Sequence, residues 1–215
     1  MRRNVLQKKM KIPKFIDPTR ISQSLHQVSL YLTAWETLCS AIIDRVKGFY
    51  TFNWNSNEQG KLVGEPDIDY KNKVLALAPN KEFHSCCLWL KNSGAINDFD
   101  LKIIDEARKH RNQIAHEIVA YIIEEHSVVN RDIISNIYNV VKKIDIWWLT
   151  EVDMAIDPKF SEEDYQVAKE SKAVGGYSFL LEIILPIFDG DFDTIVALHK
   201  EMKNHAEPKD GVYKS

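Results

Sequence analysis

A hexapeptide in the middle of the chain, Arg111-Asn112-Gln113-Ile114-Ala115-His116, brings together side chains that are suited to acid–base and phosphate chemistry. An arginine can hold a phosphate group and offset the negative charge that develops on it. A histidine can accept and return a proton near neutral pH. Such a site would need no metal, no cofactor and no cysteine. We therefore take Arg111, Asn112 and His116 as the candidate catalytic residues.

The hexapeptide lies in a stretch with helical periodicity, and one long helix is predicted from about Asn97 to Glu125. On a helical wheel, a narrow apolar arc forms the seam that should face the core: Ile104, Ala107, Ile114, Ile118 and Ile122. Arg111 projects within this seam. A guanidinium group in that position must find an anionic partner or reach past the seam into a groove.

Asn112 and His116 are four residues apart, so they share a second face of the predicted helix and can hydrogen-bond each other. Val119 and Ile123 lie on the same face. A partly apolar second face favours the packing of another element against it. We expect a second copy of this helix there, and hence a homodimer.

The spacing by itself is weak evidence, because an arginine followed by a histidine four to six residues later should occur roughly 0.7 times by chance in such a chain. Arg20 and His26 also satisfy it. The structural alternative pairs Arg111 with an acid of the first predicted helix, Glu36 or Asp44. His116 would then be an ordinary surface residue.

Basic residues precede the hexapeptide, and Arg108, Lys109 and His110 are candidates for contact with an RNA backbone. A solvated helix face explains them equally well. The chain has no HExxH pattern or glycine-rich phosphate loop, and no metal site is predicted. Trp89, Trp147 and Trp148 are expected to be core or interface residues rather than platforms for base stacking.

The elements that must position these residues are predicted to be helical throughout, with no strand and with a polar loop over 51–66. The predicted fold is all-α, an up-and-down bundle of about four long helices over 19–156. A flexible basic arm over 1–18 precedes it, and a helical extension over 157–215 packs on it. The expected helices span about 19–48, 67–92 with a break at 79–80, 97–125, 130–156, 162–188 with an interruption at 175–176, and 191–203.

Composition sets further limits on function. With 215 residues, 45% of them hydrophobic, the chain can bury a substantial core. A formal net charge of −3 argues against a protein that coats nucleic acid by bulk electrostatics. Three cysteines make neither a disulfide framework nor a metal-ligand pattern, which indicates a reducing compartment. The basic start lacks the apolar segment of a secretory signal, and no run is long enough to span a membrane, so a cytoplasmic protein is expected.

Residues 101–125, LKIIDEARKHRNQIAHEIVAYIIEE, resemble the signature helix of the HEPN superfamily. The hallmark of that family is an arginine followed directly by a polar residue, and a histidine further on with four to six residues between the arginine and the histidine, near the middle of a helix in an all-α bundle. Arg111, Asn112 and His116 match it. The first predicted helix, with WETL at 35–38, is similar to the opening helix of such domains, so the resemblance covers about residues 20–156. In one departure, Ile118 stands where some toxin members have a tyrosine that receives AMP.

The resemblance implies a metal-independent endoribonuclease that acts as a dimer and is often a toxin or a phage-defence effector. His116 would exchange protons with the ribose 2′-hydroxyl and the 5′-leaving oxygen, and Arg111 would hold the scissile phosphate. The products would carry a 2′,3′-cyclic phosphate and a 5′-hydroxyl. The alternative is a non-catalytic HEPN-like module that binds RNA, a nucleotide or a partner protein. An antitoxin or inhibitor protein is a further expected partner of the nuclease.

Overall fold

The computed structural model describes residues 17–56, 58–60, 62–123, 129–170 and 175–206, without the side chains of 122–123 and 204–206. The predicted basic arm therefore lies almost wholly outside the described residues. None of the described helices is both long enough and apolar enough to cross a membrane.

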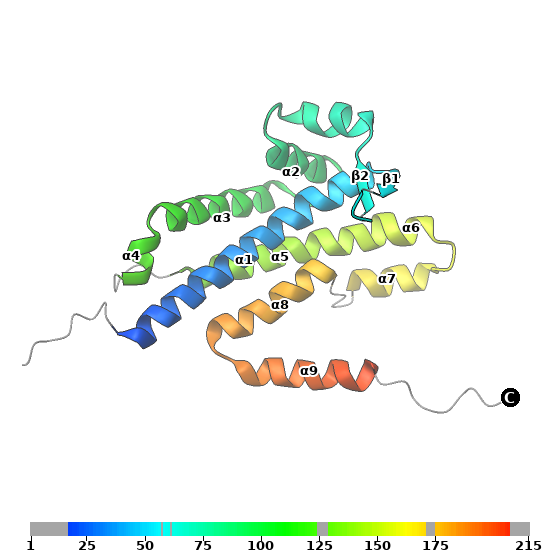
Figure 1. The fold of residues 1–215 in the computed structure, drawn as a ribbon. Coiled ribbons are helices and arrows are strands. Elements are labelled where there is room, and N and C mark those ends of the chain that lie inside the picture. The colour runs from blue at the N-terminus through cyan, green and yellow to red at the C-terminus, as the bar shows by residue number, and fades with distance from the viewer. Residues whose placement is uncertain (1–16, 57, 61, 124–128, 171–174, 207–215) are drawn as a thin grey trace, which may run out of the picture.

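The longest element is α1 (Pro18–Phe49), a helix of 32 residues that runs through the middle of the molecule (Figure 1). It starts one residue before the predicted point, because the Asp17 side chain accepts the backbone N–H of Thr19 and Pro18 occupies the first helical turn. The inner face of α1 is buried along most of its length. It therefore provides the surface on which the other long helices pack.

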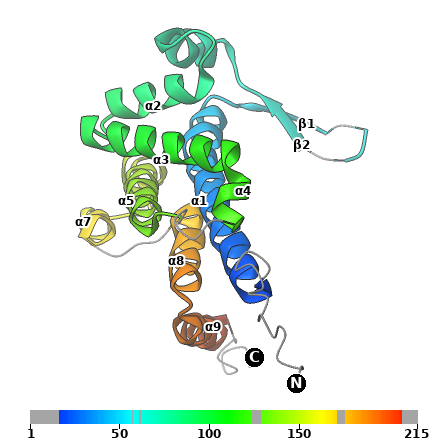
Figure 2. The ribbon, with the colours of Figure 1, turned by 90° about the vertical axis from the view of Figure 1, so that its left-hand side faces the viewer.

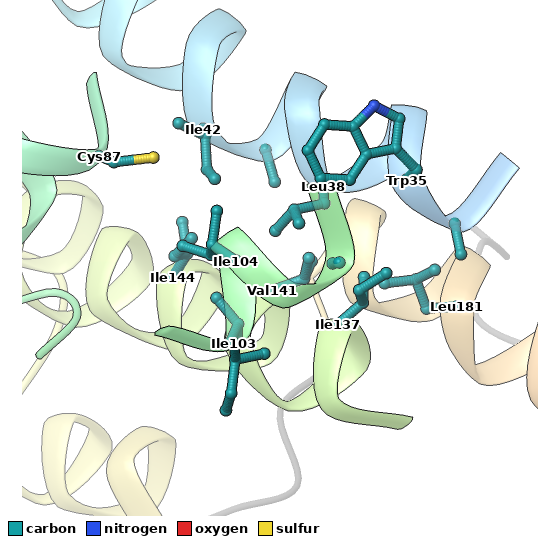
Figure 3. Close-up of a cluster of buried hydrophobic side chains, with 14 of the residues drawn as sticks. Trp35, Leu38, Ile42, Cys87, Ile103, Ile104, Ile137, Val141, Ile144 and Leu181 are labelled. Carbon is teal, nitrogen blue, oxygen red and sulfur yellow. The ribbon is translucent and has the colours of Figure 1, made fainter. Parts of the chain in front are cut away.

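The core is built mainly by four helices, α1, α3 (Asp98–His116), α5 (Arg131–Trp147) and α8 (Gly176–Asp189), and the helix over 82–92 adds Cys86, Cys87 and Leu90 to it. In Figure 1, α1 and α5 run in one direction and α3 and α8 in the other. Figure 3 shows the layer where they meet, with Leu38, Ile104, Val141 and Leu181 each supplied by a different helix. The predicted all-α, up-and-down bundle is confirmed. The sequence pattern assigns residues 176–189 to an extension packed on a bundle that ends at residue 156, whereas α8 supplies Leu181 and Ile184 to the core itself.

The shorter elements cover the ends of this bundle. A π-helical turn (Tyr70–Val74) and a 3-10 turn (Leu75–Leu77) lead to α2 (Glu82–Asn92), and the predicted break near residues 79–80 is confirmed. A π-helical turn (Trp148–Asp153) and α6 (Met154–Ile156) prolong α5, and α7 (Glu162–Glu170) follows. The last helix, α9 (Phe192–Ala206), lies at the opposite end of the molecule from α2 (Figures 1 and 2).

The expectation of a strandless polar loop over 51–66 is wrong. Two short antiparallel strands, β1 (Asn53–Ser56) and β2 (Leu62–Glu65), form a hairpin that projects from the helices (Figure 2). Trp54 lies opposite Gly64, and a Cβ atom at Gly64 would come within 2.9 Å of the Trp54 ring. The Trp54 indole therefore packs directly against the backbone of Gly64, where any other residue would place its Cβ atom. Strands of four residues in an asparagine-rich segment carry too little alternation to be recognised in sequence.

The predicted single helix from Asn97 to Glu125 is also wrong at its C-terminal end. The helix ends at His116, and a separate short helix, α4 (Ile118–Ile123), follows after Glu117. The break turns the chain so that Tyr121 becomes buried, whereas Ile118, assigned to the core seam, is 39% exposed. Neither glycine nor proline marks this point, and the β-branched residues that follow are weak helix formers. We infer that the burial of Tyr121 in the core, rather than a local sequence signal, ends α3 at His116.

One buried carboxylate joins α8 to the rest of the bundle. Asp145 on α5 is 4% exposed, and one of its oxygens accepts both the backbone N–H and the hydroxyl of Ser178, at 2.9 and 2.7 Å. Its other oxygen faces the Arg45 guanidinium at 3.5 Å. A Cβ atom at Gly175 would collide with this carboxyl group. Asp145 therefore stabilises the start of α8 and links it to α5 and α1.

Candidate functional site

Helix α3 carries all the predicted site residues and is fixed firmly at its N-terminal end. Asn97 and Asp100 form a reciprocal capping box, in which each side chain accepts the other residue's backbone N–H. The same Asp100 carboxylate, almost fully buried, pairs with Lys143 of α5 at 2.6 Å. The predicted start of the helix at about Asn97 is thus confirmed, and the capping carboxylate of Asp100 also ties α3 to α5.

A second contact fixes the middle of α3 against α1. The buried Tyr31 hydroxyl donates to the backbone carbonyl of Ala107 at 2.7 Å, one turn before Arg111. Ala107 and Ile114 flank Arg111 along the same seam and are both fully buried. The backbone that carries Arg111 is therefore held in one position relative to α1.

Arg111 is half-buried at the junction of α3 with α1. Burial raises the pKa of Cys39 to about 12, and the nearby Arg111 charge opposes that rise. Glu36 and Asp44 also act on Cys39, yet among the described residues Arg111 forms no salt bridge or hydrogen bond with either acid or with any other side chain. The ion pair of the structural alternative is therefore not formed. A half-buried cation without an acid is a candidate anion-binding group.

Asn112 and His116 lie on the last two turns of α3. Asn112 is half-buried and His116 is exposed, and no hydrogen bond between the two side chains is present in the described part of the chain. Next to them, Gln113 donates to Glu117 at 3.3 Å across the break between α3 and α4. The break leaves His116 at the exposed end of α3, one helical turn beyond Asn112.

His110 occupies a different environment from the one expected of an RNA-contacting residue. Its ring lies edge-on between Tyr31 and Tyr121, with centroid distances of 4.8 and 6.1 Å. Its Nε2 atom accepts the backbone N–H of Asn130 at 3.3 Å, which requires an unprotonated Nε2. Burial lowers the pKa of His110. In this arrangement a neutral His110 holds the chain that enters α5.

This geometry predicts that stability depends on pH. Because the pKa of His110 in the folded chain is lowered from its ordinary value of 6.5, the unfolded chain binds more protons once the pH falls below that value. The contribution of His110 to the unfolding free energy is therefore complete above about pH 6.5 and declines as the pH falls toward the lowered value. Urea unfolding at about pH 7.5 and about pH 5.5 measures this decline. His110→Gln keeps an acceptor but does not titrate, so it should flatten the decline, and an unchanged slope would contradict the assignment.

The two other predicted RNA contacts share one carboxylate. Arg108 and Lys109 both pair with Asp105, at 2.7 and 2.8 Å. These pairs lower the pKa of the Asp105 carboxyl group. Arg108 and Lys109 therefore share one carboxylate while both side chains face solvent.

Comparisons of the chain with protein-family models, with curated proteins and with solved structures found no match.

Two residues that shape the site were not among the sequence-based candidates. Asp105 precedes Arg108 and Lys109 by three and four residues, a spacing that signals ion pairs on a helix and is visible in the sequence. Tyr31 lies 76 residues before the carbonyl it binds, and no local pattern announces that contact. Within the described ranges, no group of three histidine, cysteine or acidic side chains gathers as a metal site would require.

Proposed function

We propose that this protein is a HEPN-like, metal-independent endoribonuclease whose functional residues are Arg111, Asn112 and His116. The observation that carries the proposal is the half-buried Arg111 guanidinium, which has no acidic partner among the described residues. A protein gains little by keeping an unpaired cation on an apolar seam unless the cation binds something. His116, exposed little more than one turn further along the helix, provides a proton-transfer group near any anion held there.

In the proposed reaction, one His116 imidazole accepts the proton of a ribose 2′-hydroxyl as its oxygen attacks the adjacent phosphorus. The bond from phosphorus to the 5′-oxygen breaks, and a second, protonated imidazole gives its proton to that leaving oxygen. Arg111 binds the nonbridging phosphate oxygens and offsets their growing charge. Asn112 donates a hydrogen bond to the phosphate or orients His116.

A dimer is part of this proposal, because one chain offers one His116 and the reaction uses both an acid and a base. The surface beside His116 favours such a contact, since Ile118 is 39% and Val119 63% exposed there. Two exposed aliphatic side chains next to a candidate site are what a partner helix would cover. The site is therefore composite, with the two α3 helices placed side by side.

The experiment that tests this function uses the substrate as its probe. The purified protein is incubated with single-stranded RNA in EDTA, and the ends of the products are analysed. Fragments with 2′,3′-cyclic phosphate and 5′-hydroxyl ends are expected, and a 2′-deoxy residue at a cleaved position should block cleavage there. Binding of RNA without cleavage would favour the non-catalytic module instead, and 3′-hydroxyl ends would contradict the mechanism.

The biological role we propose is that of a cytoplasmic toxin or defence effector held in check by an inhibitor protein. Unrestrained cleavage of cellular RNA would stop growth, so induced expression of the wild-type chain should be toxic. The same induction of an Arg111→Ala chain, at equal protein level, should permit growth. Equal growth of both strains would argue against the toxin role.

A further inference from the structure

A cavity between α2 and α3 lies outside the proposed catalytic residues. Its volume is about 560 Å³, within the range that small-molecule and nucleotide sites occupy. The apolar side chains of its wall come from both helices: Phe83, Cys87, Leu101 and Ile104. Figure 3 shows the Cys87 side chain of α2 directed inward, toward the part of the core that holds Ile42 of α1 and Ile104 of α3.

The cavity wall carries two cations, Lys81 and Arg108, and two carboxylates, Glu82 and Asp105, and each carboxylate also has a cationic partner outside the wall. Glu82 accepts a hydrogen bond from the Tyr70 hydroxyl at 2.8 Å and lies 3.9 Å from the Lys47 amine. Asp105 is shared between two cations, of which Arg108 lines the cavity.

Lys81 lines the same cavity, is exposed, and has no ion pair among the described residues. Lys81 and Arg108 therefore offer positive charge to a ligand from two different elements. An apolar wall with an aromatic ring and cations at the edge matches a base joined to a phosphate.

The cavity is aligned with the proposed catalytic arginine. Ile104, Arg108 and Arg111 follow one another at steps of four and three residues, so they lie on one face of α3. Arg108 is one helical turn from Arg111. A nucleotide strand whose scissile phosphate reached Arg111 would therefore place a neighbouring nucleotide near the cavity.

We propose that this cavity binds one nucleotide of the RNA strand, with the base against Phe83 and Leu101 and the phosphate between Lys81 and Arg108. The proposal rests on the nuclease function and names how its substrate is held. It also assigns a site for sequence preference, because the shape of the apolar wall decides which base fits.

Binding of a 2′-O-methyl oligoribonucleotide to the full-length protein tests this subsite independently of cleavage, because such a strand lacks the attacking hydroxyl. The double variant Lys81→Glu/Arg108→Glu is expected to bind at least about tenfold more weakly. For this variant, the slope of log Kd against log salt concentration should also be smaller, by about 0.7 for each phosphate that the variant no longer neutralises. The matched control is Lys200→Glu/Lys203→Glu, two exposed lysines of α9 at the far end of the molecule, which should bind like the wild type (Figure 2).

A second variant, Leu101→Trp, tests the base. It fills the cavity without changing the charge, and a folded protein, checked by circular dichroism, should bind about tenfold more weakly. If Lys81→Glu/Arg108→Glu and Lys200→Glu/Lys203→Glu weakened RNA binding equally, the loss would reflect nonspecific electrostatic attraction and the subsite would be overturned. Unchanged binding by both Lys81→Glu/Arg108→Glu and Leu101→Trp would also overturn it. The nuclease assignment is judged separately by cleavage in EDTA, so a failure of either proposal is recognisable.

Discussion

Replacement of Arg111 by methionine should slow RNA cleavage severely with little or no loss of protein stability. Methionine keeps the apolar stem on the seam and removes the charge. Without a group that binds the phosphate in the transition state, cleavage should slow by about 10²–10³-fold. The unfolding free energy should change by less than about 0.5 kcal/mol or rise, because Arg111 makes no salt bridge among the described residues.

The matched control is Arg131→Met, which should show the opposite pattern. Arg131 of α5 makes a two-pronged pair with Asp189 of α8, with nitrogen–oxygen distances of 2.8 and 2.7 Å. Removal of this pair should cost about 0.5–1 kcal/mol and leave cleavage unchanged. Urea unfolding and cleavage assays on both variants give the comparison. A stability loss above about 1 kcal/mol for Arg111→Met, with cleavage retained, would make Arg111 a structural residue.

The largest effect on stability is expected at Asp145. Asp145→Ala removes the acceptor of two hydrogen bonds from Ser178 and breaks the ion pair between Asp145 and Arg45. The unfolding free energy should fall by about 3 kcal/mol, since buried donors and a partly buried cation lose their partner together. For a chain of this size the midpoint of thermal unfolding should fall by about 6–12 °C.

Ser178→Ala separates the components of that effect. It removes the hydroxyl hydrogen bond but keeps the backbone N–H and the Arg45 contact, so it should cost only about 1 kcal/mol. Unfolding in urea, followed by circular dichroism, measures both variants. If Asp145→Ala cost no more than Ser178→Ala, the carboxylate would not be the group that joins α8 to the bundle.

Much of the fold is predictable from sequence because its signals are local. The N-caps at Asn97 and Asn130 and the positive φ of Gly94 at the end of α2 are each decided within a few residues. The end of α3 at His116 is not predictable, because it depends on where Tyr121 packs. The hairpin has no strong sequence signal. Its main cross-strand contact places the Trp54 ring over Gly64, and a glycine leaves no pattern of paired side chains to recognise.

The candidate site is predictable in part for the same reason. Helical periodicity places Arg111 on the seam, and its half-buried position agrees with that. The sequence cannot show that Arg111 lacks an acidic partner. Either Glu36 or Asp44 could pair with it until the register of α1 against α3 is known. The basic stretch around His110 suggests a surface cation at that position. The enclosed position of His110 is not visible in the sequence, because the two tyrosines that enclose it lie 79 residues before and 11 residues after it.

Mixed dimers test the composite site most directly. Co-expression with two affinity tags isolates dimers of one wild-type and one His116→Ala protomer, with His199→Ala, a substitution on the far helix α9, as the control. If acid and base come from different protomers, the mixed His116 dimer should cleave RNA in EDTA at less than about 1% of the wild-type rate, whereas the mixed His199 dimer should be fully active. Half of the wild-type rate, or full activity of the His116→Ala homodimer, would contradict the composite site.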